Sequence, residues 1–228
     1  MPPNPVTQGI SEARAVRREL GVDPFQPLDP TAVARRLGIL LVRRPLRSAV
    51  LSGMHAYDQS LDSHFILVNS TQRIIRQRFT TAHEIGHARF DRDTIVESLP
   101  ASDVSPQEKR ANAFAGELLM PEAAVKKWNP VLPWGEDVND IARLAVHFGL
   151  SFEATIWRLY NAQRIEDPAV MKARRDEIAA DLRRTLREPG DGATEYPEQY
   201  IELIKEGVSR SLVSRGRAAE LLASGDEY

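Results

Sequence analysis

The segment His83-Glu84-Ile85-Gly86-His87 is the feature that most limits how this chain can fold, because its two histidines are four residues apart. It lies within residues 78–90, a run that reads as a helix. Positions i and i+4 of a helix lie on one face, so both imidazoles point the same way with the Glu84 carboxylate beside them. Such a face can hold a zinc ion and its water, and the fold must leave room for both.

The alternative is a helix whose histidines are only polar surface groups. The apolar stripe of this helix argues against a surface role, because both histidines belong to the stripe. Its members follow one another at steps of three and four residues: Phe79, Ala82, His83, Gly86, His87 and Phe90. Gly86 costs a position inside a helix about 1 kcal/mol relative to alanine. That cost makes sense where another backbone or the surroundings of a metal come close, so metal binding is the favoured interpretation.

A zinc protease site needs a third protein ligand and keeps a fourth position open for water. The chain has no cysteine, so the candidates are carboxylates further along, in residues 105–121. This segment is expected to be a helix, with Ser105 as N-cap, Pro106 in the first turn and a stop at Pro121.

Two glutamates of this second helix, Glu108 and Glu117, are nine residues apart, which is about 900° of rotation, so only one can face the metal. Glu108 is favoured because its face also carries Ala111 and Asn112, which allow close approach of another helix. Asn112 could also orient a ligand by a hydrogen bond, or make an ordinary contact between helices. Glu117 is followed by two leucines and has no such polar companion. The alternative for Glu108 is a capping role, reaching back to the N-cap amide.

Both segments resemble the ImmA/IrrE metallopeptidases, which combine a helical HExxH with a downstream Glu-x-x-Ala-Asn-x-Phe-Ala-x-x-Leu-Leu-Met-Pro. The matching residues here are 78–87 and 108–121, and the resemblance covers about residues 10–160. It implies an α+β, zincin-like (gluzincin-like) peptidase fold with a Zn²⁺ cofactor. It also implies metal ligands His83, His87 and Glu108, with Glu84 as the catalytic residue.

The chemistry expected of this site is hydrolysis of a peptide bond. Glu84 would act as general base, taking a proton from the zinc-bound water and passing it to the departing amine. Manganese or iron could occupy the same nitrogen and oxygen ligands. The donor for the oxyanion stays unassigned, because each candidate is more readily explained as structural; the candidates are His64, His147, Tyr57 and Tyr160.

A small mixed sheet is expected before the two helices of the site, giving an α+β architecture. The elements predicted there are helices over 11–20 and 31–37 and strands over 38–42, 49–58 and 64–69, with Thr71 as the next N-cap and a surface loop over 100–105. The strand over 64–69 is hypothesised to border the active site and to receive extended substrate by edge pairing.

The C-terminal half is expected to be helical. Two short helices around Gly149-Leu150-Ser151, after a bend over 128–135, look like a helix-turn-helix. DNA binding is not favoured, because the net charge is −2 and the second helix has few Lys or Arg; packing beside the catalytic core or holding substrate is preferred. Further predictions are a charged helix over 164–187, a linker over 188–194 and helices over 197–206 and 214–222.

These elements suggest three parts: a metallopeptidase domain over 1–127, a helix-turn-helix-like segment over 128–187 and a C-terminal helical tail over 188–228. Without cysteine there are no disulfides and no thiolate metal sites. The N-terminus does not read as a signal peptide, and the longest aliphatic run, residues 39–42, cannot span a bilayer. A cytoplasmic location without membrane attachment is therefore expected.

The function implied by the resemblance is zinc-dependent endopeptidase activity, with limited cleavage of a partner protein. That partner would be a helix-turn-helix transcriptional repressor or antitoxin, cleaved in response to stress or phage-related signals. The alternative is a non-proteolytic DNA- or protein-binding regulator with a structural metal. Glu84 separates the two, since a structural zinc has its fourth position closed by protein and no use for a carboxylate beside open water.

Overall fold

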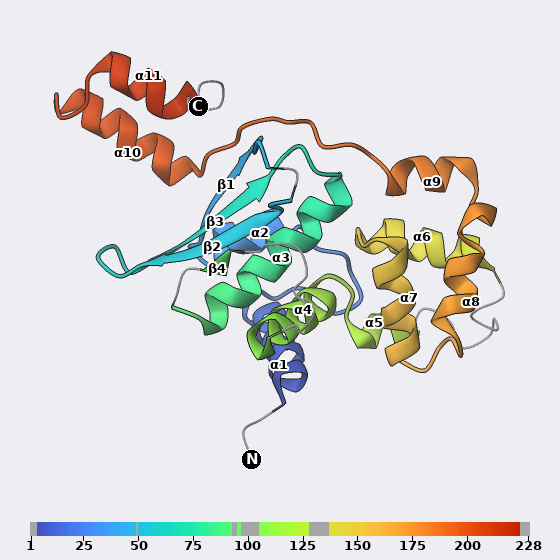
Figure 1. Cartoon of the computed structure of the whole chain (residues 1–228). Helices are drawn as coiled ribbons and strands as arrows, with labels where there is room; N and C mark the ends of the chain where they lie inside the picture. Colours follow the sequence, from blue (N-terminus) through green and yellow to red (C-terminus); the bar gives the residue numbers. More distant parts are fainter. Residues whose placement is uncertain (1–3, 49, 93–94, 97–104, 128–136, 224–228) are drawn as a thin grey trace.

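The computed structural model describes residues 4–48, 50–92, 95–96, 105–127 and 137–223 (Figure 1). Its helices are α1 (Pro5–Glu19), α2 (Pro30–Arg36), α3 (Ile74–Phe90), α4 (Pro106–Leu119), α5 (Glu122–Lys127), α6 (Val138–Phe148), α7 (Phe152–Asn161), α8 (Pro168–Ala173), the short 3₁₀ helix η1 (Arg175–Glu177), α9 (Ala180–Leu186), α10 (Glu198–Ser209) and α11 (Arg215–Ala223). Its strands are β1 (Leu40–Arg44), β2 (Gly53–Asp58), β3 (Ser63–Asn69) and β4 (Ile95–Val96).

The strands form a mixed sheet in the order β1-β3-β2-β4. β1 runs parallel to β3, and β2 runs antiparallel to both β3 and β4. The α+β architecture with a small mixed sheet is therefore confirmed. The hypothesis of substrate pairing along residues 64–69 is wrong, because β3 is an inner strand whose two edges are already paired by β1 and β2.

Several helix starts follow the capping signals of the sequence. The Ser105 side chain accepts the Glu108 amide at 3.2 Å, as expected of an N-cap. α1 begins six residues before the predicted start, because the Asn4 side chain accepts the Val6 amide at 2.9 Å and caps the helix. Thr71 is not an N-cap; its hydroxyl donates to the Asn69 side chain, and α3 begins three residues later.

The charged segment over 164–187 is not one helix, contrary to the prediction. It is divided into α8, η1 and α9. Met171 and Ile178 are both buried, and Ile178 takes an extended conformation that ends η1. Anchoring two apolar side chains to the core therefore interrupts the helix. The bend over 128–135 and residues 100–104 of the predicted loop lie outside the described residues.

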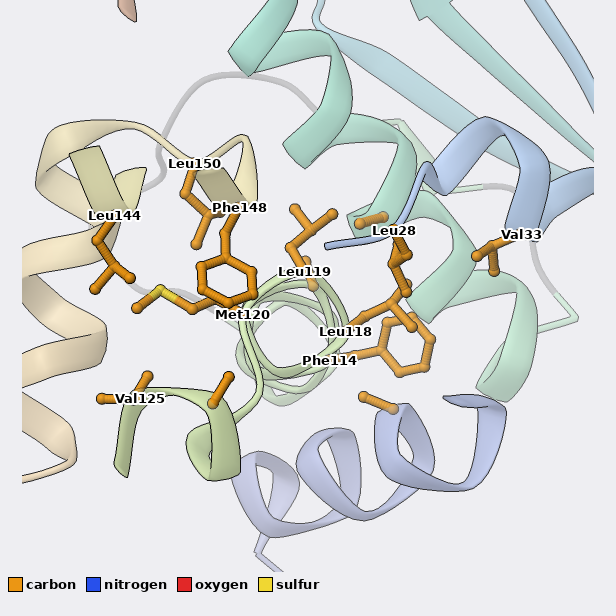
Figure 2. Close-up of a cluster of buried hydrophobic side chains, with 14 of the residues drawn as sticks. Leu28, Val33, Phe114, Leu118, Leu119, Met120, Val125, Leu144, Phe148 and Leu150 are labelled. Atoms are coloured by element: carbon orange, nitrogen blue, oxygen red, sulfur yellow. The ribbon is translucent and has the colours of Figure 1, made fainter. Parts of the chain in front are cut away.

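The hydrophobic core surrounds α4 (Figure 2). On one side of α4, Phe114 and Leu118 lie near Leu28 from the loop before α2; on the other, Met120 lies near Phe148 from α6. The two helices that look like a helix-turn-helix thus share the core of the peptidase segment, as the preferred interpretation expects. The tight turn between them is made by a left-handed glycine, Gly149, with φ of 68°.

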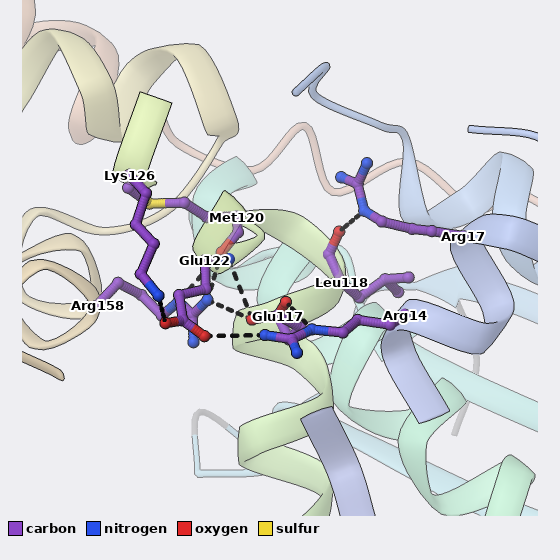
Figure 3. Close-up of polar contacts among 8 residues, drawn as sticks. All are labelled: Arg14, Arg17, Glu117, Leu118, Met120, Glu122, Lys126 and Arg158. Atoms are coloured by element: carbon purple, nitrogen blue, oxygen red, sulfur yellow. Dashed lines mark hydrogen bonds and ion pairs between the residues drawn. The ribbon is translucent and has the colours of Figure 1, made fainter. Parts of the chain in front are cut away.

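Glu117 ties three helices together on the face of α4 opposite Glu108 (Figure 3). The carboxylate, only 1% exposed, accepts from Arg14 Nε of α1 at 2.8 Å and from an Arg158 amino group of α7 at 2.6 Å. Arg14 also pairs with Glu122 at 2.9 Å. Glu117 therefore has polar partners, but they come from distant helices and not from its neighbours in the sequence.

The predicted linker after α9 has neither helix nor strand from residue 188 to 194 and reaches the outer edge of β1. There Arg43 and Glu195 exchange backbone hydrogen bonds of 2.9 and 2.7 Å. The helices expected over 197–206 and 214–222 are present as α10 and α11. Within the described ranges, no helix has the length and apolar character needed to cross a membrane.

Candidate metal centre

α3 carries both histidines through the most buried part of the molecule. Residues 80–88 are all buried, and the helix packs against β2 and β3 on one side and against α4 on another. His83 and His87 have side chains that are 1% exposed. The surface alternative for these histidines is therefore excluded by burial.

Gly86 lets α4 approach α3 closely. A Cβ built on Gly86 would lie 3.1 Å from the Ala111 Cα and 3.2 Å from the Phe114 ring. Both neighbours are buried, so they have little room to move. This close packing brings Glu108, one helical turn before Ala111, over the histidine face of α3.

The side chains of His83, His87 and Glu108 converge on one point. The two Nε2 atoms are 3.0 Å apart. The Glu108 carboxylate places one oxygen 3.2 Å from His83 Nε2 and the other 3.2 Å from His87 Nε2. Among the described residues, these three form a group of donor atoms, all within 4.8 Å of one another, that could hold a metal ion.

The donor set matches zinc in chemistry and in spacing. Zinc binds imidazole nitrogen and carboxylate oxygen at about 2.0–2.2 Å, so ligand atoms at tetrahedral positions lie about 3.3–3.6 Å from one another. The observed separations of 3.0–3.2 Å are slightly shorter and need only a small outward shift. Two nitrogens and one carboxylate also leave a fourth position for a non-protein ligand.

Each histidine is oriented by a hydrogen bond on its other ring nitrogen. His83 Nδ1 lies 3.1 Å from Asn112 Oδ1, and His87 Nδ1 lies 3.0 Å from Asp91 Oδ2. Amide and carboxylate oxygens only accept, so both Nδ1 atoms carry the proton and donate it. Both Nε2 atoms are then available to the site, the arrangement that metal-binding histidines use.

The electrostatics of the site favour positive charge between these side chains. Burial lowers the pKa of His87, but its hydrogen bonds to Glu108 and Asp91 outweigh burial, and the pKa is raised overall. The hydrogen bonds from His83 and His87 hold the pKa of Glu108 well below its ordinary value. A site that stabilises a proton on His87 and an ionised Glu108 also suits a cation.

Glu84 is fully buried between α3 and the start of β2. A Cβ built on Gly53 would lie 3.2 Å from Glu84 Oε1 and 2.3 Å from the Thr80 methyl group. Only glycine at position 53 therefore allows the strand to lie this close to the carboxylate. Burial of an ionised carboxylate is costly without compensation, and a cation held by the adjacent histidines would reduce that cost.

Asp91 belongs to the site, although the sequence reasoning missed it. It is the C-cap of α3 and lies between His87 and Arg110 of α4, whose guanidinium contacts its other oxygen at 2.5 Å. Its spacing of four residues after His87 is the signal that could have revealed it.

His55 is the second residue that was missed, and it connects two of the oxyanion candidates to the site. Its ring stacks with His87 at 6.5 Å between centroids, and its Nε2 lies 2.8 Å from His64 Nδ1. Tyr57 packs against His64 at 4.8 Å. Burial, followed by the neighbouring His64 and His87, lowers the pKa of His55 to about 4. Its position opposite Ile66, in the middle of β3, depends on strand pairing, which no local pattern reveals.

The other two oxyanion candidates make their recorded ring contacts away from these histidines. His147 packs edge-on against Phe148 in α6, and Tyr160 packs against Trp157 in α7. The role of oxyanion donor stays unassigned.

Comparisons with known proteins point the same way. The family model Peptidase_M78, described as the IrrE N-terminal-like domain, matches residues 34–160, which is more than half of the chain. No curated protein gave a match. The matched region contains α3 and α4, and therefore all the residues that converge on the candidate centre. Together with the cluster, the family supports a metal-dependent peptidase acting on protein. The chain belongs to the IrrE N-terminal-like peptidase family, which confirms the resemblance to ImmA/IrrE metallopeptidases and the zincin-like α+β fold.

Proposed function

We propose that this protein is a zinc-dependent endopeptidase. The observation that carries the proposal is the convergence of His83, His87 and Glu108, with Glu84 of the same helix beside them. When bound, zinc is a Lewis acid that lowers the pKa of a coordinated water to about 7 and polarises a peptide carbonyl. The three side chains are proposed as its ligands.

Glu84 is proposed as the general base. It follows His83 directly in α3, so its carboxylate is fixed to the same rigid element as two of the ligands. It takes a proton from the attacking water and transfers it to the departing amine nitrogen. The close approach of β2 at Gly53 limits the positions that the carboxylate can adopt.

Asn112 and Asp91 are proposed as positioning residues. Each accepts a hydrogen bond from the Nδ1 of one histidine, which fixes the tautomer and the ring orientation. Arg110 in turn holds Asp91 and stacks over the Phe90 ring at 4.3 Å. Preorganised ligands need not rearrange when the metal binds, so these contacts raise its affinity.

The substrate is proposed to be a helix-turn-helix repressor or antitoxin, cut at a limited number of sites under stress or phage-related signals. This part rests on the resemblance to ImmA/IrrE peptidases. A cavity of about 740 Å³ next to the site could accept apolar side chains of such a protein. Asn112 and Phe79, which both contact His83, line this cavity together with Trp157.

The test is incubation of the zinc-loaded chain with the helix-turn-helix regulator encoded beside it. We expect cleavage at one or a few positions, lost on treatment with a chelator and restored by zinc. Glu84→Gln should abolish cleavage while binding zinc, whereas Glu202→Gln, which changes an exposed carboxylate of α10 that does not line the cavity, should cut normally. Cleavage that persists in Glu84→Gln would rule out the proposed base.

A non-proteolytic regulator with a structural metal is the competing class. It requires a fourth protein ligand, yet only three donors converge within the part of the chain that the structure describes. Binding of hydroxamate peptides to the cobalt-substituted protein separates the two classes. A catalytic site with an exchangeable water ligand should bind them, whereas a structural site closed by four protein ligands should not.

A further inference from the structure

A second cavity lies at the start of α3, about two helical turns before His83. Its volume is about 700 Å³, within the usual range of small-molecule sites. Three separate parts of the chain line it: residues 71–79, the first turn of α7 and residues 175–187. α9, which supplies part of the last segment, lies beside α6 at the end of the molecule away from α10 and α11 (Figure 1).

Arginine dominates the polar lining of this cavity. Five arginines and one carboxylate line it, which leaves four positive charges in excess; these residues are Arg73, Arg76, Arg175, Arg183, Arg187 and Glu153. Because the whole chain has a net charge of −2, the excess is a local concentration of positive charge. Such a concentration in a concave site attracts anions.

Most of these arginines are not neutralised by the protein. Glu153 pairs with Arg175 at 2.8 Å. Within the described ranges, Arg73, Arg183 and Arg187 form no ion pair with a carboxylate. The planar guanidinium group is suited to bidentate recognition of phosphate oxygens, and the positive end of the α7 dipole adds to the attraction.

The remaining lining is apolar. Phe152 and Ile178 are buried, and Phe79 and Leu186 are partly buried against the core. Arginines and a hydrophobic surface within one cavity suit a ligand that has both a phosphate group and a flat apolar part. A ligand carrying charge alone would leave this surface uncovered.

We propose that the arginine cavity binds a small phosphorylated ligand of the nucleotide type, with phosphates on the arginines and the base on the apolar surface. A DNA backbone is disfavoured because the arginines line a hollow and do not follow an exposed stripe. A bound ligand would connect α3, which carries His83, with α7 and α9. It would therefore stabilise the assembly of these three helices.

The test is calorimetric titration of the full chain at low salt with three probes: adenosine diphosphate, inorganic pyrophosphate and adenosine. We expect the diphosphate to bind at least about tenfold more tightly than either part alone, since only it satisfies both surfaces. Raising the salt concentration should weaken its binding.

Two α9 variants separate the cavity from general charge. The double change Arg183→Gln and Arg187→Gln should weaken binding of the diphosphate by at least about tenfold, because charged hydrogen bonds to phosphate are lost. Arg184→Gln is the matched control; this residue lies on α9, is exposed and does not line the cavity. Its affinity should stay within about twofold of the wild type, because Arg184 does not line the cavity and makes no hydrogen bond to the phosphates there.

Four results would overturn the proposal. They are no binding of the diphosphate at millimolar concentration, equal affinity for adenosine and the diphosphate, equal affinity for pyrophosphate and the diphosphate, and an equal loss in the Arg184→Gln control. The proposal would also give way to a DNA-binding site if a random DNA duplex bound through Arg183 and Arg187 and displaced the diphosphate. Circular dichroism of each variant establishes that the fold is kept.

Discussion

Two glutamates of the same helix are predicted to have separate effects when changed to glutamine. Glu117 is buried and bonded to two arginines, whereas Glu108 is partly exposed and faces the histidines. We expect Glu117→Gln to lower the free energy of unfolding without changing zinc affinity in the folded protein. We expect Glu108→Gln to lower zinc affinity far more than Glu117→Gln does.

The magnitude for Glu117 follows from its partners. One oxygen accepts from Arg14, and the other accepts from Arg158 and from the Glu122 amide at 3.2 Å. Glutamine keeps only one acceptor oxygen, so one arginine loses its partner. Loss of one member of a buried ion pair costs about 3–5 kcal/mol. Arg14 is 45% exposed and can turn to water, so about 2–3 kcal/mol is expected here.

Urea unfolding of chelator-treated protein measures this loss. With a slope of about 1–3 kcal/mol per molar urea, the midpoint of Glu117→Gln should fall by roughly 1 M. Glu122→Gln is the control, because Glu122 is 35% exposed and pairs at the surface with Arg14 and Lys126. It should cost less than about 1 kcal/mol.

Competition with a chromophoric chelator measures zinc affinity. Glu108→Gln should weaken it by more than about a hundredfold, because even the hydrogen-bond partners of zinc ligands contribute about 10–100-fold. The reasoning is refuted if Glu117→Gln loses zinc to the same extent, or if its unfolding midpoint equals that of the wild type.

Three further predictions concern the surroundings of the site. Asp91→Asn should weaken zinc binding by about tenfold in chelator competition, because the amide holds His87 less strongly than the carboxylate does; unchanged affinity would remove Asp91 from the site. Gly86→Ala should lower the free energy of unfolding by about 1 kcal/mol, because overpacking against Ala111 costs about 1–3 kcal/mol and the gain in helix propensity returns only about 1 kcal/mol. A higher urea midpoint would show that α4 moves aside. His55 titrates near pH 4 in the folded protein and near 6.5 when unfolded, so the unfolded state binds more protons between these values. Metal-free protein should therefore lose up to about 3 kcal/mol as the pH falls from 6.5 to 4, and this part of the slope should be absent in His55→Gln; equal slopes would contradict the assignment.

The parts of the site that could be predicted are those fixed by helix geometry. The spacing of His83 and His87 determines a shared face in any helix, and the phase between Glu108 and Glu117 separates them whatever packs nearby. The close approach of α4 at Gly86 could also be predicted, because a glycine inside a helix lowers stability and close packing against it explains why it is there.

The parts that could not be predicted depend on pairing between distant segments. Whether β3 is an inner strand is decided by β1 and β2 together, so its own composition could not show that its edges are occupied. The orientation of Asp91 depends on Arg110 from another helix. The break at Ile178 reflects where the core could accept an apolar side chain, which local charge patterns do not record.

The helix-turn-helix-like pair illustrates how one local geometry can serve a different purpose. A DNA-reading second helix needs an exposed basic face, but Arg158 of α7 is committed to Glu117 and to the Met120 carbonyl. The apolar faces of α6 and α7 are buried, with Phe148 against Met120 at the end of α4. The family match also extends to residue 160, one residue before the end of this pair. The tight turn at Gly149 therefore serves to fold two helices against α4, and the position of Glu108 over the histidines depends in part on that support.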